Sequence, residues 1–148
     1  MYFKHPGSLI LVLIQVFLIV ILFFSGPVYP ANLLSFLLII IALVLGLWTL
    51  WTLATKSRLN GPAEVAPGSR LVTSGPYKYI RNPLYSAILI GSLGLFFNDY
   101  SLLRLILCFL LSCLLIYKIR LEEYYLSQLF HEYQSYAAKT YRLIPGIY

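Results

Sequence analysis

The sequence predicts an all-α integral membrane protein with about four transmembrane helices, the last two a short hairpin, and a C-terminal helix at the membrane interface. The 148-residue chain is 60% apolar and only 11% charged, whereas soluble domains have about 25% charged residues. Its charges also gather between long uncharged blocks. A chain of this length has too little interior to bury so much apolar surface. Residues 1–148 are therefore expected to form a single domain within the bilayer.

The N-terminal part, residues 8–54, is expected to contain two anchor helices. Residues 8–24 carry no charge and are about one bilayer crossing long, and residues 31–54 are comfortably long enough to span. The segment SGPVYPAN between them is typical of a turn. Because no small-residue cleavage site follows the first block, we expect an anchor there rather than a cleaved signal peptide.

The next two apolar blocks, residues 84–97 and 105–117, are shorter. At about 1.5 Å per residue, neither reaches across the ~30 Å hydrocarbon core. We therefore expect a hairpin that tilts little, thins the bilayer or fails to cross it fully. The closely spaced small residues Ala87, Gly91 and Gly94 favour close packing of the third helix on the fourth.

The polar stretch after residue 117 has the periodicity of a helix lying at the membrane interface. Glu122, Leu126, Leu129 and Tyr133 fall on one helical face. We expect this segment to form a helix separate from the preceding apolar block.

Basic residues lie mainly on one side of the predicted membrane. They are Lys4 before the first helix, Lys56, Arg58, Arg70, Lys78 and Arg81 after the second, and Lys118, Arg120, Lys139 and Arg142 after the fourth. The opposite connections hold only Arg104, which Asp99 is expected to offset. Both termini and residues 55–82 are therefore predicted to be cytoplasmic. The net charge of +6 is interpreted as a topology signal with some attraction to anionic lipid, and not as nucleic-acid binding.

The sequence lacks the motifs of several common enzyme and metal sites. Cys108 and Cys113 lie five residues apart in an apolar block, which favours packing over a redox or metal role. His5 and His131 are isolated, so no metal site is expected. There is no nucleophile elbow, P-loop or dinucleotide fingerprint.

Two polar clusters remain, at residues 70–85 and 118–136. Pro83 suits the first turn of a helix capped by Asn82, and such a helix start attracts a carboxylate or phosphate. Glu122 and Glu123 point about 100° apart on a helix, and a carboxylate can accept hydroxyl or ammonium hydrogens. Taken alone, the acids fit a solvated helix and Arg81 fits a snorkelling anchor. Together, the clusters predict a site for a zwitterionic ligand with a sugar and a base.

Two motifs carry a resemblance to a known family. LVTSGPYKYIRNPLY, residues 71–85, resembles the cofactor segment of the isoprenylcysteine carboxyl methyltransferases, whose wider relatives are phospholipid N-methyltransferases. EEYYLSQLFHEYQSYAAKTYRLIP, residues 122–145, resembles that family's terminal segment. The resemblance implies an integral-membrane methyltransferase that uses S-adenosylmethionine, with residues 70–145 as its cofactor-binding and catalytic region.

The resemblance also implies roles for individual residues. The residues that it places at the cofactor are Leu71, Val72, Tyr77, Arg81, Asn82, Pro83, Leu84, Tyr85, Glu122 and Glu123. It implies that Lys118 orients the acceptor, with Arg120 as its rival. No covalent nucleophile and no metal is implied.

This sequence departs from the family pattern at several positions. Asn82 stands where many relatives carry His, and Lys118 offers a point charge in place of a guanidinium. Phe130-His131 stands where the family pattern has Phe-Gly, and Tyr133 lies one residue closer to it than the tyrosine of the pattern does. These departures affect the expected identity of the acceptor and not that of the methyl donor.

The expected reaction moves a methyl group to a lipid-like or prenylated acceptor, a carboxylate or an amine, at the cytoplasmic membrane face. A carboxylate needs no base, whereas an amine must first lose a proton, with Glu123, His131 or a tyrosine as the assisting group. The alternatives are an NADPH-dependent membrane sterol or enone reductase and a non-catalytic membrane scaffold.

Overall fold

The computed structural model describes residues 6–56 and 71–146, and these residues form an all-helical fold. The helices are α1 (Pro6–Phe24), α2 (Leu33–Lys56), α3 (Pro83–Asn98), α4 (Leu102–Leu129) and α5 (Tyr133–Ala137), with one 3-10 turn, η1 (Gly75–Lys78). Within these ranges the structure has no strand, and Ile80 and Tyr141 form an isolated bridge. The predicted fold class is confirmed at this level.

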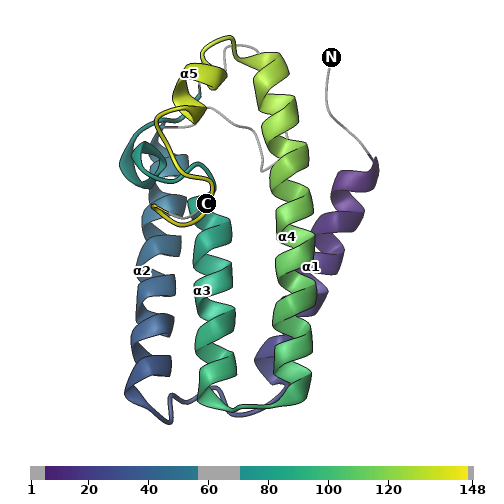
Figure 1. The fold of residues 1–148 in the computed structure, drawn as a ribbon. Coiled ribbons are helices and arrows are strands. Elements are labelled where there is room, and N and C mark those ends of the chain that lie inside the picture. The colour runs from purple at the N-terminus through teal and green to yellow at the C-terminus, as the bar shows by residue number, and fades with distance from the viewer. Residues whose placement is uncertain (1–5, 57–70, 147–148) are drawn as a thin grey trace.

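The four long helices stand side by side as an up-and-down bundle (Figure 1). The connections between α1 and α2 and between α3 and α4 lie at one end, drawn at the bottom of Figure 1. The end of α2, η1, the start of α3, the end of α4 and α5 gather at the other end, which we call the polar end. The bundle thus brings both polar clusters of the sequence to the same place.

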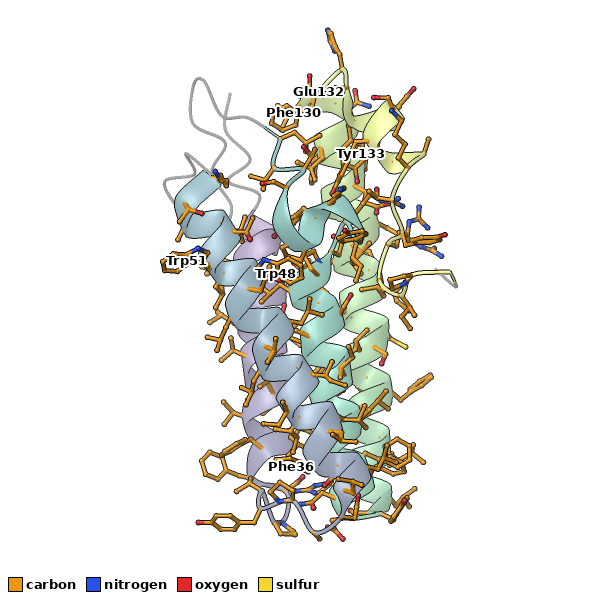
Figure 2. The ribbon with its side chains drawn as sticks, turned by 90° about the vertical axis from the view of Figure 1, so that its left-hand side faces the viewer. Phe36, Trp48, Trp51, Phe130, Glu132 and Tyr133 are labelled. Carbon is orange, nitrogen blue, oxygen red and sulfur yellow. The ribbon has the colours of Figure 1, made fainter. Side chains whose placement is uncertain are left out.

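Two of the described helices, α2 and α4, are long and apolar enough to cross a membrane. The apolar helices α1 and α3 are shorter. Much of the apolar surface faces outward: Leu47 is 67% exposed and Phe109 66%. Trp48 and Trp51 are also exposed and lie near the polar end of α2 (Figure 2). Interfaces between membrane and water are enriched in this residue type.

The structure corrects the predicted end of the fourth helix. Instead of a block ending at residue 117 and a separate interfacial helix, α4 runs unbroken for 28 residues to Leu129. Residues 118–129 contain no glycine or proline and many strong helix formers, so the helix continues where the apolar pattern stops. It ends at Phe130, whose backbone is extended, and Tyr133 belongs to α5.

The small residues of α3 face α2, so the prediction that they pack against α4 is wrong. A Cβ on Gly94 would lie 3.0 Å from Ile39 Cγ1 and 3.3 Å from the Ile39 backbone nitrogen. A Cβ on Gly91 would lie 3.3 Å from the Ala42 Cβ. Spacing identifies small residues that permit close approach, but it does not say which neighbour approaches.

The opposite face of α3 packs in a core between α1 and α4. Leu22, Leu107, Cys108, Leu111 and Leu115 form the buried centre of this core. Cys108 is buried as expected, whereas Cys113 is exposed. One thiol therefore packs in the core and the other faces outward.

Gly94→Ala is expected to lower the midpoint of thermal unfolding, because the added methyl group overpacks the interface between α2 and α3. Overpacking costs about 1–3 kcal/mol. Gly46→Ala is the matched control, since its Cβ would meet the Ala87 Cβ at an ordinary 3.7 Å and helix propensity favours both changes equally. Equal midpoints for the two variants in detergent would contradict the close contact at Gly94.

A buried arginine lies at the end of the bundle opposite the polar end. Arg104 is fully buried. Its guanidinium donates to Ser25 Oγ (3.1 Å), to the Leu95 carbonyl (2.6 Å) and to the Pro27 carbonyl (3.0 Å). Within residues 6–56 and 71–146 it forms no ion pair with Asp99, and its hydrogen bonds join α3 and α4 to the connection between α1 and α2.

Candidate active site

The segment that leads into α3 is shaped by a glycine and a proline. Gly75 has a φ of +61°, and a Cβ there would lie 2.5 Å from Thr52 Oγ1 on α2. Only glycine fits such a backbone and such an approach. Pro83 opens α3 as predicted, but Asn82 makes no side-chain capping bond. Its Nδ2 instead donates to Glu123 Oε1 (3.4 Å) and the Arg142 carbonyl (3.3 Å). Asn82 therefore stands at the predicted N-cap position of α3, but its side chain does not cap the helix.

Side chains from three helices meet around Glu122. Tyr85, in the first turn of α3, donates its hydroxyl hydrogen to Glu122 Oε1 at 2.6 Å. Lys118, one turn earlier on α4, places Nζ 5.1 Å from the centre of the Tyr85 ring. The same Nζ donates to Oε1 of Gln15 on α1 at 2.5 Å. We call Gln15, Tyr85, Lys118 and Glu122 the Glu122 cluster.

Tyr77 borders this cluster from η1. Burial raises the pKa of the Tyr77 phenol, and the neighbouring Tyr136 and Glu122 add to the effect. Burial also raises the pKa of Tyr136 to about 12, and the Tyr136 hydroxyl donates to the Tyr77 carbonyl at 2.7 Å. Both phenols therefore stay protonated at neutral pH, with the Tyr136 hydrogen already donated to the Tyr77 carbonyl.

Glu123 faces a different set of partners. Its two carboxylate oxygens accept from Arg81 Nε (2.9 Å) and Arg142 Nε (2.8 Å). Arg81 Nη1 also donates to the Ala137 carbonyl at 2.8 Å and to the Thr140 carbonyl. We call Arg81, Glu123 and Arg142 the Glu123 cluster. It joins the start of α3, the last turns of α4 and the chain after α5.

The chain after α5 runs back across the start of α3. The Arg81 amide donates to the Tyr141 carbonyl at 2.7 Å, and the Tyr141 amide donates to the Tyr79 carbonyl at 3.0 Å. Ser86 Oγ donates to the Leu143 carbonyl at 2.7 Å. The Glu123 cluster and these hydrogen bonds together hold the C-terminal segment against the helix start that carries Tyr85.

The two basic residues expected near the acceptor lie in different surroundings. Lys118 is 7% exposed and belongs to the Glu122 cluster. Arg120 is exposed and borders an open hollow of about 520 Å³ on the side of Glu123, Tyr133 and Arg142. The prediction that both follow the fourth helix is wrong, because α4 continues past them.

The structure therefore divides the predicted site residues into two groups. Tyr77, Tyr85, Glu122 and Lys118 lie together, whereas Arg81, Asn82 and Glu123 contact one another and the C-terminal segment. Pro83 is buried in the first turn of α3, and Leu71, Val72 and Leu84 are partly buried. Sequence reasoning missed Gln15, whose only signal is being the polar residue within the apolar stretch of residues 9–24.

The sequence profile of the family described as phospholipid methyltransferase matches residues 31–133. The chain belongs to this family. The match includes the whole of α2, α3 and α4, and it excludes α1. It confirms the resemblance drawn from the two motifs. Phospholipid methyltransferase family membership and the two long apolar helices together indicate a membrane protein.

Two curated relatives are similar to this member of the phospholipid methyltransferase family. The cobalt-zinc-cadmium resistance protein CzcN of Cupriavidus metallidurans is 34% identical over 99 residues, which cover 65% of this chain and 46% of the relative. The nickel-cobalt-cadmium resistance protein NccN of Alcaligenes xylosoxydans xylosoxydans matches with the same identity and coverage. The chain thus spans about half the length of these relatives. No solved structure matches it.

Proposed function

We propose that this protein transfers a methyl group from S-adenosylmethionine to a lipid-like or prenylated acceptor at the cytoplasmic membrane face. The observation that carries the proposal is the Glu122 cluster. It places a carboxylate, a phenol and a buried ammonium at one end of an apolar bundle, in a chain of a methyltransferase family. A polar donor from water and an acceptor dissolved in the membrane can both reach such an end.

The residues around Glu122 fit the chemistry of the donor. A carboxylate accepts hydrogens from an ammonium or from ribose hydroxyls, and tyrosine faces attract cations. Glu122, Tyr85 and Tyr77 would hold the donor, which supplies a methyl group already activated on a sulfonium sulfur. As the family resemblance implies, the donor site would be lined by Leu71, Val72, Pro83 and Leu84.

Arg81, Asn82 and Glu123 have a second role in this proposal. Because both Glu123 oxygens are bonded to arginines, these residues fix the start of α3 and thereby the position of Tyr85. Correct alignment of reacting groups alone can contribute about 7–11 kcal/mol to a rate. The site needs to position its reactants and exclude water, and no nucleophilic side chain is required.

Lys118 would orient the acceptor, since its ammonium lies beside Tyr85 within the Glu122 cluster. A carboxylate acceptor reacts without a base. An amine must first lose a proton, for which the nearby Glu122 carboxylate is available. Arg120, on the exposed hollow, is the second candidate for contact with an acceptor headgroup.

We further propose that α1–α4 all cross the membrane, with the polar end in the cytoplasm, because basic residues are concentrated there. In a Cys108→Ala, Cys113→Ala background, Ser135→Cys on α5 is expected to react with an impermeant thiol reagent only from the cytoplasmic side. Tyr100→Cys, in the connection between α3 and α4, should react only from outside. Labelling in the reverse pattern would contradict this orientation.

The names of the two curated relatives refer to metal resistance. Within residues 6–56 and 71–146, no group of three or more His, Cys, Asp and Glu side chains is placed to hold a metal ion. The proposal rests on the Glu122 cluster and on family membership, and not on those names.

The proposal is tested by incubating the purified protein with native lipid extract and methyl-labelled S-adenosylmethionine. Label should pass into a lipid fraction, which mass spectrometry then identifies. NADPH is added in a parallel reaction. Consumption of NADPH without label transfer would favour the reductase alternative, and absence of both activities would favour the scaffold.

A further inference from the structure

Lys118 is a buried cation whose charge is not balanced by direct contact. It is 7% exposed, and within the described ranges it takes part in no ion pair. Burying a charge is costly unless a partner compensates it. Ionisable residues inside membrane helices are therefore usually functional.

Both groups that hold the Lys118 ammonium are neutral. Gln15 Oε1 accepts one of its hydrogens at 2.5 Å, and the Tyr85 ring lies 5.1 Å away. Glu122, one turn further along α4, attracts the ammonium electrostatically, but it forms no ion pair with Lys118, and its Oε1 accepts the Tyr85 hydroxyl. The ammonium is thus fixed in place without an ion-pair partner and can bind an anion.

Gln15 is the unusual member of this arrangement. It is partly buried and stands within a stretch of α1 that is otherwise apolar. Helix α1 also lies outside the region that matches the family. A neutral amide at this position orients the ammonium, whereas a carboxylate would pair with it and cancel its charge.

We propose that Gln15 is a positioning residue, which holds the Lys118 ammonium beside Tyr85 so that it binds the anionic group of a membrane-dissolved acceptor. The inference rests on the proposed function in one respect, namely that the bound anion belongs to a methyl acceptor. The anionic group is a phosphate or a carboxylate, both of which accept hydrogen bonds from an ammonium. A neutral lipid would gain nothing from this contact.

Binding of simple lipids tests the inference without relying on turnover. The full chain in neutral detergent is titrated with hexadecyl phosphate, palmitate and hexadecanol, which differ in headgroup, and affinity is read from tryptophan fluorescence or calorimetry. The wild type should bind at least one anionic probe about tenfold more tightly than hexadecanol, and the two anionic arms separate phosphate from carboxylate recognition.

The variants are Gln15→Met, which removes the accepting oxygen, and Gln15→Glu, which adds a competing charge. Both should reduce the ratio of anionic to neutral affinity about tenfold and leave affinity for S-adenosylhomocysteine unchanged. Gln128→Met, at an exposed glutamine of α4, is the matched control and should keep the wild-type ratio. A merely structural role for Gln15 would weaken binding of all probes together with thermal stability.

Equal affinity of the wild type for all three probes, or an unchanged ratio in Gln15→Met, would overturn the inference. A failure of the proposed function can be distinguished from a failure of this inference. Selective anion binding that depends on Gln15, found in a protein that transfers no methyl group to any lipid, would remove the methyltransferase assignment and leave the contact between Gln15 and Lys118 standing.

Discussion

Glu123→Gln is expected to lower the free energy of unfolding by about 3 kcal/mol. Breaking a buried ion pair costs about 3–5 kcal/mol, because the remaining partner stays buried without compensation. Glu123 is 11% exposed and Arg81 10%, but Arg142 is 36% exposed, so the lower end of that range applies. Unfolding by denaturant or heat in detergent measures the loss.

The C-terminal segment should respond most strongly to this change, since Arg81 and Arg142 join it to α3 and α4. Limited proteolysis of Glu123→Gln should cleave after α5 at lower protease concentration than in the wild type. Glu132→Gln, at an exposed acid outside the two described ion pairs, is the control. Equal stability and equal cleavage of the two variants would show that the Glu123 cluster does not hold this segment.

Glu122→Gln is expected to weaken binding of S-adenosylhomocysteine by about 1.5–3 kcal/mol, the usual size of a hydrogen bond to a charged group. This corresponds to about 10- to 150-fold in the dissociation constant. Glu122 forms no ion pair with the described residues, so its replacement should affect stability less than that of Glu123. Calorimetry on the purified variants measures the affinity.

The neighbouring acids therefore give opposite expected results: Glu122→Gln loses donor affinity and Glu123→Gln loses stability. Glu132→Gln again serves as the control for a surface charge. If Glu122→Gln bound the donor product as tightly as Glu132→Gln does, Glu122 would have to be removed from the site.

The helices could be predicted from the sequence wherever an apolar block coincides with a whole helix. The start of α3 was found because Pro83 marks it directly. The end of α4 was missed because charge marks where an apolar environment stops, whereas the backbone needs a glycine, a proline or an extended residue such as Phe130 to end a helix.

The candidate site was predictable in its residue types and only partly in its arrangement. Helical geometry separates Glu122 from Glu123, but the partners of each come from distant segments, Tyr85 on α3 for one and the chain after α5 for the other. The role of Gln15 depends on the crossing of α1 and α4, which no local pattern encodes. The same is true of the small residues of α3, whose neighbour is decided by packing.

A crystal structure of the protein with S-adenosylhomocysteine bound tests the central claim most directly, namely that the Glu122 cluster is the place where donor and acceptor meet. We predict that the ligand contacts Glu122 and Tyr85 and lies on the same side of α4 as Lys118. A ligand bound in the open hollow beside Arg120 and Glu123, with no contact to Glu122, would contradict the account.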